Sequence, residues 1–496
     1  MTLPIPVICV VFALLVALLC MFGLNNLLLL YFNVKPCTFS LERKEILREW
    51  PYVTIQVATY NEGYVVTRLL DACLKIDYPK DKMEIIVVDD STDETINILR
   101  EYERRYYPRI KVIHRGRRDG YKAGALNEAL RYSKGEFILI LDADSIPEQD
   151  FLKKTIPLFF TNGRLGFAQG RPKYLNEDES WLTKTFALIN DWFAYFTQVA
   201  LSRQGMVMSF IGHAGVFRRR ALEDAGGWMS DTITEDMDMA YRLQLKGWEA
   251  TYVEDAVSLE EVPPSYYASI VRFKRHLKGP LQNLIKHGGA VIKHRRFSVI
   301  KKIEAIIQMA YPTVYLLGLI CLIMTAAVYM IVPGKIIDGF WHSGAGFISS
   351  AFMLLSLPYI ALVISPIPST LILAVTAAFA LILLAMGERG LGKIDVKTIF
   401  GTLLIWNDNI LNCLTPIFEI LVKKGGEWVA TERTLKRHSF SADGRLKEAI
   451  FRILSSLLVS LAFLKIALLN FSLNSLGILL PAALWLCSAY LIIEGK

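Results

Sequence analysis

The chain has 496 residues, of which 53% are hydrophobic and 21% are charged, and its formal net charge is +8. Soluble globular proteins are about 45–50% apolar and about 25% charged, so this composition argues against a disordered chain. The basic clusters lie beside apolar segments, which suits a lipid bilayer with anionic headgroups rather than nucleic acid. The seven cysteines are odd in number and form no C-x-x-C pair, which indicates neither a disulfide framework nor a cysteine-ligated metal.

An apolar segment covers residues 5–32 and is interrupted only by Gly23-Leu24-Asn25-Asn26. No Lys or Arg precedes it, and it exceeds the apolar core of a signal peptide, so we predict an uncleaved transmembrane helix over residues 1–34. A charged flank follows it at 41–49. Under the positive-inside rule, this asymmetry places the N-terminus outside and the following domain in the cytoplasm of a multi-pass cell-membrane protein.

Residues 35–302 form a soluble block in which short apolar runs alternate with helical patterns. Strands are predicted over residues 53–58, 84–88, 111–114 and 137–141, and a helix over residues 62–74. Ser91 or Asp93 is expected to cap the helix after the second strand. Strands that alternate with helices predict an α/β domain with a parallel, Rossmann-like sheet, which binds its ligand at the carboxyl ends of the strands.

Apolar segments recur after this block, over residues 305–333, 345–364, 367–386, 453–469 and 475–493. A weaker segment, 398–418, contains Asn407-Asp408-Asn409, which is tolerable at membrane depth only where protein buries it. The basic loop 419–449 should be cytoplasmic, so this polar segment must also cross or dip into the bilayer. We therefore expect a transmembrane region over 303–418, a cytoplasmic loop over 419–449 and a transmembrane hairpin over 450–496, with six or seven spans in total.

Residues with polar side chains follow three of the predicted strands, namely Tyr60, Glu62, Asp90, Asp142 and Asp144. One aspartate after a strand is usually a helix cap, but carboxylates at several strand ends are typical of a ligand site. Asp142-Ala143-Asp144 follows a buried strand, and such a pair can hold Mg²⁺ or Mn²⁺ on a diphosphate. The metal would then neutralise a leaving diphosphate.

A second acidic cluster, Thr234-Glu235-Asp236-Met237-Asp238, precedes an amphipathic segment over residues 239–245. Asp236 lies where a helix should begin, and the helix dipole stabilises a carboxylate there. The same carboxylate could act as a general base that removes a proton from an acceptor hydroxyl. The residues alone leave both alternatives open.

Five segments resemble, in order, the motifs of glycosyltransferase family 2. They are 57–62 (VATYNE), 87–91 (VVDDS), 120–127 (GYKAGALN), 141–144 (LDAD) and 234–236 (TED). The resemblance is greatest to the membrane-embedded branch that includes cellulose, hyaluronan and plant mannan synthases, and it covers the whole soluble block. It implies a GT-A fold, a UDP- or GDP-linked sugar donor, and Mg²⁺ or Mn²⁺ as the cofactor.

The resemblance also implies a role for each matched residue. Tyr60 and Glu62 would line the pocket of the nucleotide base, and Asp90 would hold the uracil or guanine. Lys122 would approach the diphosphate, and Asp142 would contact the nucleotide.

The remaining two matched aspartates would take part in the transfer itself. Asp144 would bind the divalent metal. Asp236 would be the catalytic base, and inversion at the anomeric carbon would give a β-linkage from an α-linked donor.

Two positions depart from the family at the expected acceptor site. Processive members carry Q-x-x-R-W, where this chain has Arg272, Arg275 and His276, so only the arginine is kept. An imidazole stacks on a sugar less well than the missing tryptophan. His213 also replaces a threonine of the family's F-x-G-T motif. These departures leave the acceptor, and the processivity of transfer, open.

The segment Glu427–Arg433 resembles the gating loop of the family, in which Trp428, Thr431 and Arg433 would cover the bound nucleotide. The alternative is a polar loop beside the membrane. A separate basic stretch, residues 272–278, either anchors the chain at the membrane surface or recognises an anionic acceptor such as a polyprenyl phosphate.

Together, these features predict an inverting, metal-dependent glycosyltransferase that acts at the membrane and synthesises a β-linked polysaccharide. One alternative is the transfer of a single sugar to a polyprenyl phosphate or glycolipid. A second alternative, from another class, is an inactive transport or scaffold protein. The retained aspartates at positions 90, 142, 144 and 236 favour an active enzyme.

Overall fold

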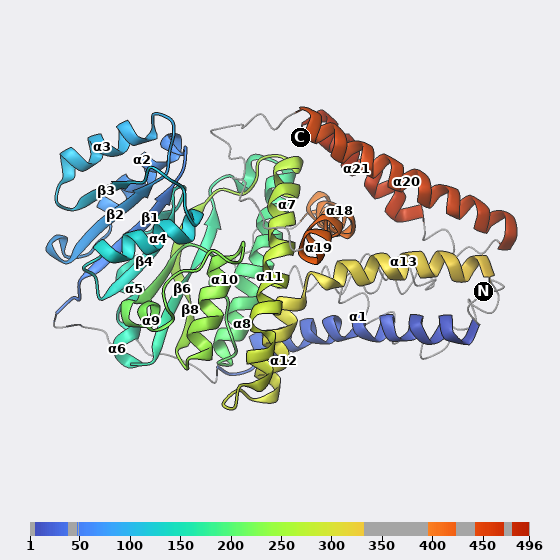
Figure 1. Cartoon of the computed structure of the whole chain (residues 1–496), viewed down its shortest axis with the longest axis horizontal. Coiled ribbons are helices and arrows are strands. Elements are labelled where there is room, and N and C mark those ends of the chain that lie inside the picture. The colour runs from blue at the N-terminus through green and yellow to red at the C-terminus, as the bar shows by residue number, and fades with distance from the viewer. Residues whose placement is uncertain are drawn as a thin grey trace.

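The computed structural model describes residues 5–37, 47, 49–331, 395–422, 442–470 and 479–495. An α/β domain lies at one end of the molecule, and long apolar helices extend away from it (Figure 1). The predicted spans 345–364 and 367–386 lie outside the described residues, and so do Trp428, Thr431 and Arg433 of the predicted gating loop.

In the described part of the chain, eight strands form one sheet in the order β3-β2-β1-β4-β7-β6-β8-β5. The strands are β1 (Val53–Thr59), β2 (Met83–Asp89), β3 (Ile110–His114), β4 (Phe137–Asp142), β5 (Ile146–Pro147), β6 (Leu165–Tyr174), β7 (Gly215–Arg218) and β8 (Glu249–Glu260). The first four are parallel to one another, and β7 pairs antiparallel with β4. The four predicted strands and the α/β Rossmann-type fold are confirmed.

Helices cover both faces of this sheet (Figure 1). Those of the domain are α2 (Gly63–Leu74), α3 (Thr95–Tyr106), α4 (Tyr121–Tyr132), α5 (Phe151–Thr155), α6 (Leu158–Thr161), α7 (Trp181–Asp191), η3 (Trp192–Thr197), α8 (Gln198–Arg203), α9 (Arg219–Asp224), α10 (Glu235–Leu245) and α11 (Tyr266–Lys293). Helix α3 begins at Thr95, and its N-cap residue Glu94 makes no side-chain cap. Of the two residues predicted to cap it, Asp93 accepts a 3.0 Å hydrogen bond from the Thr95 N–H through its Oδ1, whereas Ser91 does not cap the helix. The Ser91 hydroxyl instead accepts a 2.7 Å hydrogen bond from the Asn61 N–H, so it stabilises the turn after β1.

Alternate residues of each strand pack into different cores, because successive strand side chains point to opposite faces. Leu139 and Leu141 of β4 join the core that contains α2 and α3. Ile138 and Ile140 join a second core, to which α1 contributes Leu29. Strand β4 is therefore buried on both faces, which explains its uninterrupted apolar sequence and places Asp142 firmly at its end.

The remaining described helices are α1 (Ile5–Val34), α12 (Val299–Ala310), α13 (Thr313–Ile331), α18 (Val396–Asn412), α19 (Leu414–Leu421), α20 (Ala442–Asn470) and α21 (Leu479–Glu494). Among the described residues, two segments, Ala17–Val34 and Ala442–Leu468, are long and apolar enough to cross a membrane. The segment predicted as one span over 305–333 is bent by 68° between α12 and α13. Pro312 lies at this bend, where it has no N–H to continue α12.

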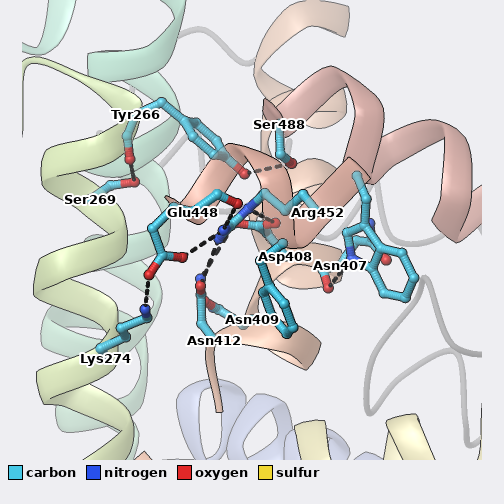
Figure 2. A network of polar contacts seen from close by, with 12 residues as sticks. Tyr266, Ser269, Lys274, Asn407, Asp408, Asn409, Asn412, Glu448, Arg452 and Ser488 are labelled. Atoms are coloured by element: carbon cyan, nitrogen blue, oxygen red, sulfur yellow. Dashed lines mark hydrogen bonds and ion pairs between the residues drawn. The ribbon is translucent and has the colours of Figure 1, made fainter. Parts of the chain in front are cut away.

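A network of polar contacts joins these helices to the domain (Figure 2). Arg452 of α20 donates hydrogen bonds of 2.8 and 2.6 Å to Asp408 of α18 and one of 2.7 Å to Glu448. Glu448 in turn accepts a hydrogen bond from Lys274 of α11. Asp408 and Arg452 are both fully buried. The polar part of the 398–418 segment is thus buried against protein. The network of which Asp408 is a member connects α11, α18 and α20.

Candidate active site

The carboxyl ends of the parallel strands open into a cavity of about 410 Å³. The described residues that the sequence assigned to the donor, the metal, the base or the acceptor all line it, namely Tyr60, Glu62, Asp90, Lys122, Asp142, Asp144, His213, Asp236, Arg272, Arg275 and His276. The cavity also reaches Tyr315 of α13 and Trp406 of α18. It therefore extends from the sheet to the apolar helices.

One end of the cavity contains an aromatic ring and an aspartate, each held by an arginine. The Arg118 guanidinium lies 3.7 Å from the centre of the Tyr60 ring. Arg115 donates to both carboxylate oxygens of Asp90, at 2.6 and 2.5 Å. Such a two-pronged pair fixes the orientation of the carboxylate. Sequence reasoning missed both arginines, although the run Arg115-Gly116-Arg117-Arg118 directly precedes a motif segment.

The centre of the cavity is organised around Lys122 at the start of α4. Its Nζ donates to Asp142 Oδ1 at 2.5 Å and to the Gly212 carbonyl at 2.8 Å, and it lies 4.0 Å from Glu235 Oε1. Gly212 has a φ of +92°, and a Cβ there would lie 2.9 Å from Asp236 Oδ2. The glycine thus leaves room for the Asp236 carboxylate, and a Cβ there would also lie 3.8 Å from Lys122 Nζ. Residues from β4, α4 and α10 meet at this point.

Two carboxylates at the start of α10, Glu235 and Asp236, bind protons more tightly than usual. Burial and the neighbouring Asp236 charge raise the pKa of Glu235 to about 7. Burial also raises the pKa of Asp236, although the Lys122 cation acts in the opposite direction. Burial alone would lower the pKa of Lys122, but Asp142 and Glu235 raise it, so the amine stays charged. A carboxylate with a raised pKa is a better proton acceptor at neutral pH than an exposed one.

Asp142 and Asp144 have the chemistry of a divalent-metal site that needs a ligand to complete it. Asp144 is 3% exposed and lies at the cavity wall. Within the described ranges, no three His, Cys, Asp or Glu side chains are placed to hold a metal ion by themselves. Mg²⁺ commonly takes one or two protein carboxylates and completes its shell with phosphate oxygens and water. The two aspartates therefore fit a metal that is bound together with a diphosphate.

His213 lies beneath the same site and is held on both ring nitrogens. Its Nε2 is 3.1 Å from Glu260 Oε2, and its Nδ1 is 3.3 Å from the Ser145 hydroxyl. Burial alone would lower the pKa of His213, but the Glu260 carboxylate raises it above its usual value. Glu260 ends β8, and no sequence motif drew attention to it. His213 is thus a fixed part of the cavity wall, and Glu260 favours its protonated form.

The basic stretch of α11 divides between two faces of the helix. Arg272, Arg275 and His276 line the cavity. Lys274 is paired with Glu448, and Lys278 is paired with Glu419 at 2.7 Å. The two lysines are therefore bound by carboxylates of the protein rather than directed at lipid headgroups. Enclosure in the cavity wall, and then the charges of Arg272 and Arg275, lower the pKa of His276.

Close packing between α10 and α11 sets the position of Asp236 relative to Arg275. A Cβ on Gly279 would lie 2.2 Å from the Thr234 side chain, so only glycine allows this contact. Asn283 donates to the Thr234 hydroxyl at 2.9 Å, and His287 lies 2.8 Å from Asp238. The loop before α10 is therefore fixed against α11 on both sides of Asp236.

A comparison with protein families identifies the domain. The family described as "Glycosyltransferase like family 2" matches residues 51–279. This segment is a family 2 glycosyltransferase domain. The match includes β1 to β8, α10 and the first half of α11, so the glycosyltransferase domain contains all eleven predicted site residues that line the cavity.

Two curated plant relatives match about half of this chain. The probable glucomannan 4-beta-mannosyltransferase 11 of Oryza sativa subsp. japonica is 36% identical over 264 residues, which are 51% of this chain and 46% of the relative. The glucomannan 4-beta-mannosyltransferase 1 of Cyamopsis tetragonoloba is 35% identical over 284 residues, which are 55% and 53% of the two chains. The chain thus spans about half the length of the curated relatives it matches.

A solved structure shares the fold of the glycosyltransferase domain and part of its surroundings. It is the mannosyltransferase PcManGT from Pyrobaculum calidifontis, in complex with GDP-Man and Mn²⁺. Its TM-score is 0.52 at 22% identity, over 83% of this chain and 99% of that one. The likeness confirms the GT-A-like fold predicted from the sequence.

Proposed function

We propose that the protein is an inverting glycosyltransferase that moves a sugar from a nucleotide-diphosphate donor onto a glycan acceptor at the membrane, and so extends a β-linked polysaccharide. The observation that carries this proposal is the single cavity in which Lys122, Asp142 and Asp236 meet. GDP-mannose is the first donor to test, because the plant relatives are named as mannosyltransferases and the solved structure holds GDP-Man.

The donor nucleotide would bind at the strand ends. Tyr60 and Glu62 would flank the base, and Asp90, oriented by Arg115, would accept a hydrogen bond from it. Lys122 and Arg275 would place positive charge beside the diphosphate as negative charge develops on it. Asp144, together with Asp142, would hold Mg²⁺ or Mn²⁺, which supplies Lewis-acid stabilisation of the leaving group when bound.

Asp236 would act as the general base in the transfer. An acceptor hydroxyl has a pKa far above 7, so it attacks efficiently only if a positioned group removes its proton. The acceptor oxygen would form a bond to the anomeric carbon as the bond to the diphosphate breaks, and its proton would pass to Asp236. Attack from the face opposite the leaving group would invert the configuration and give a β-linkage from an α-linked donor.

The acceptor would occupy the part of the cavity beside α11, where His213, Arg272, Arg275 and His276 lie. A polymer is favoured because the cavity continues to Tyr315 and Trp406 of the helices beyond the domain. Transfer of one sugar to a polyprenyl phosphate remains the second candidate, because two arginines face the cavity and can bind a phosphate. Product size on a gel separates the two candidates.

We also propose a multi-pass arrangement with the catalytic domain in the cytoplasm, supported by the charged flank after α1 and the apolar helices. In this arrangement Trp428, Thr431 and Arg433 would belong to a cytoplasmic loop over the nucleotide. Protease accessibility in inside-out vesicles tests the orientation, because the domain should be cleaved only when the cytoplasmic face is exposed.

The decisive experiment is a screen of GDP- and UDP-linked sugars with the purified full chain, with product analysis by mass spectrometry. We expect one donor to yield a β-linked product in the presence of Mg²⁺ or Mn²⁺. Release of no nucleotide from any donor would contradict the proposed function and would favour an inactive transport or scaffold protein.

A further inference from the structure

The end of the cavity that faces α1 and α12 contains polar groups that the transfer does not use. Asn25 and Asn26 of α1 and Glu304 and Gln308 of α12 line this end. The two asparagines interrupt an apolar segment that can span a membrane, and Glu304 lies in the bent, apolar pair α12 and α13. Polar side chains in such segments are energetically costly, so they usually face other protein groups or a cavity with a function.

Several of these polar groups are buried without a full set of partners. Glu304 is 1% exposed and Asn25 is 8% exposed. Asn25 Nδ2 donates to Glu304 Oε1 over 3.5 Å, which is at the limit of a hydrogen bond. Among the described residues, Glu304 Oε2 and Asn25 Oδ1 have no hydrogen-bond partner, and the same holds for Asn190 Nδ2 on the cavity wall. Each such group destabilises the folded protein unless something satisfies it.

Aromatic rings lie beside these polar groups. Phe193 and Tyr311 line the cavity and contact each other edge to face, with ring centres 5.5 Å apart. Tyr315 of α13 also lines the cavity, and its ring lies edge to face with that of Tyr311, with centres 6.1 Å apart. A wall that combines aromatic faces with amide and carboxylate groups matches a sugar ring, which has apolar C–H faces and a rim of hydroxyl groups.

We infer that Asn25, Asn190 and Glu304 form a binding subsite for a neutral sugar unit of the acceptor glycan, an inference that rests on the proposed function. A hydroxyl group both donates and accepts hydrogen bonds, so sugar hydroxyls can satisfy Glu304 Oε2, Asn25 Oδ1 and Asn190 Nδ2 together. The Glu304 carboxyl group disfavours an anionic lipid phosphate at the same position. The subsite thus binds a polyol rather than a phosphate.

The test measures binding by the full chain in lipid nanodiscs, with β-1,4-linked mannohexaose as the probe and GDP as a reference ligand. We expect Glu304→Leu and Asn25→Leu each to raise the Kd for mannohexaose at least tenfold. Glu304→Gln keeps the size of the side chain but loses the stronger hydrogen bonds of a charged group, so a smaller rise is expected. Ile303→Ala and Leu24→Ala, at exposed neighbouring positions on the same two helices, serve as matched controls and should bind mannohexaose as the wild type does.

Unchanged GDP binding shows that a variant is folded, and the use of two helices prevents the result from depending on one variant. The inference is overturned if the wild type does not bind mannohexaose, or if folded variants at positions 25 and 304 bind it as tightly as the controls. Displacement of mannohexaose by a short polyprenyl phosphate would also overturn it. A wild type that binds mannohexaose through Glu304 but transfers no sugar from any donor would support the subsite and contradict the proposed function.

Discussion

The two ends of the cavity differ in whether their buried polar groups have partners within the protein. At the donor end, charges are paired in advance: Lys122 with Asp142, and Arg115 with Asp90. At the membrane end, Glu304 and Asn25 keep oxygens that no other described residue satisfies. The donor end is therefore preorganised around a charged ligand, which lowers the cost of reorientation during the reaction. The membrane end instead leaves hydrogen-bonding capacity for a neutral one.

The largest effect is expected when the proposed general base at the donor end is removed. Asp236→Asn keeps the shape of the side chain but cannot accept the acceptor's proton. We expect sugar transfer to fall by about 10²–10⁴-fold, the usual contribution of a general base. Nucleotide affinity, measured by calorimetry, should not change, because the pocket proposed for the nucleobase lies elsewhere in the cavity. Retained turnover would contradict the role of Asp236.

The next largest effect is expected for the proposed metal ligand. Asp144→Ala should reduce transfer at least about 100-fold, because a bound cation contributes several kcal/mol to the transition state. A Mn²⁺ titration of activity checks the cause: the variant should need far more metal, or should no longer respond to it. A variant with the wild-type metal dependence would exclude Asp144 as a ligand.

Packing between α10 and α11 offers a test with a built-in control. Gly279→Ala places a methyl group 2.2 Å from the Thr234 side chain and should displace Asp236. A displacement of about 1 Å can reduce the rate of an enzyme about 100-fold. Gly289→Ala lies on the same helix with nothing within 4 Å of its new methyl group. Gly289→Ala should leave the transfer rate at the wild-type value. Equal rates for both variants would contradict the proposal that packing between α10 and α11 positions Asp236.

The pH dependence of transfer should reflect the buried carboxylates at the start of α10. Burial raises the pKa of Asp236 against the opposing charges of Lys122 and Arg275, with Asp142 adding to the rise, and Glu235 titrates near pH 7. A base must be deprotonated to act, so activity should fall as the pH drops, by about tenfold per unit below the raised pKa. A rate profile from pH 5 to 9 measures this. A rate that stays constant down to pH 5 would show that Asp236 titrates as an ordinary exposed carboxylate.

The smallest effect is expected at the acceptor platform. His276→Trp introduces the larger aromatic ring that processive members of the resembled family carry at this position. The change should lengthen the product rather than alter the donor affinity. Product length on a sizing gel, at equal donor turnover, measures the change. An unaltered length distribution would argue against contact between residue 276 and the acceptor.

The sequence predicted the donor end of the cavity well but the membrane end poorly. Asp90 and Asp142 follow parallel strands, so their convergence follows from the strand ends meeting at one edge of the sheet. Asp236 begins α10, and its place beside them depends on tertiary packing. Glu304 pairs with Asn25 across 279 residues, and Asp408 pairs with Arg452 across 44. No local pattern indicates such partners. The roles of the site residues stay predictions until they are tested.

By itself, the sequence determined the α/β domain, its strand ends, its family and the apolar segments on both sides, because each depends on periodicity and short motifs within one segment. Only the tertiary structure decided which face of α11 lines the cavity and which lysines and arginines are paired with carboxylates. It also decided which buried polar atoms lack a hydrogen-bond partner among the described residues. Those outcomes depend on contacts between distant segments, where the balance of burial and charge pairing is set by packing rather than by local order.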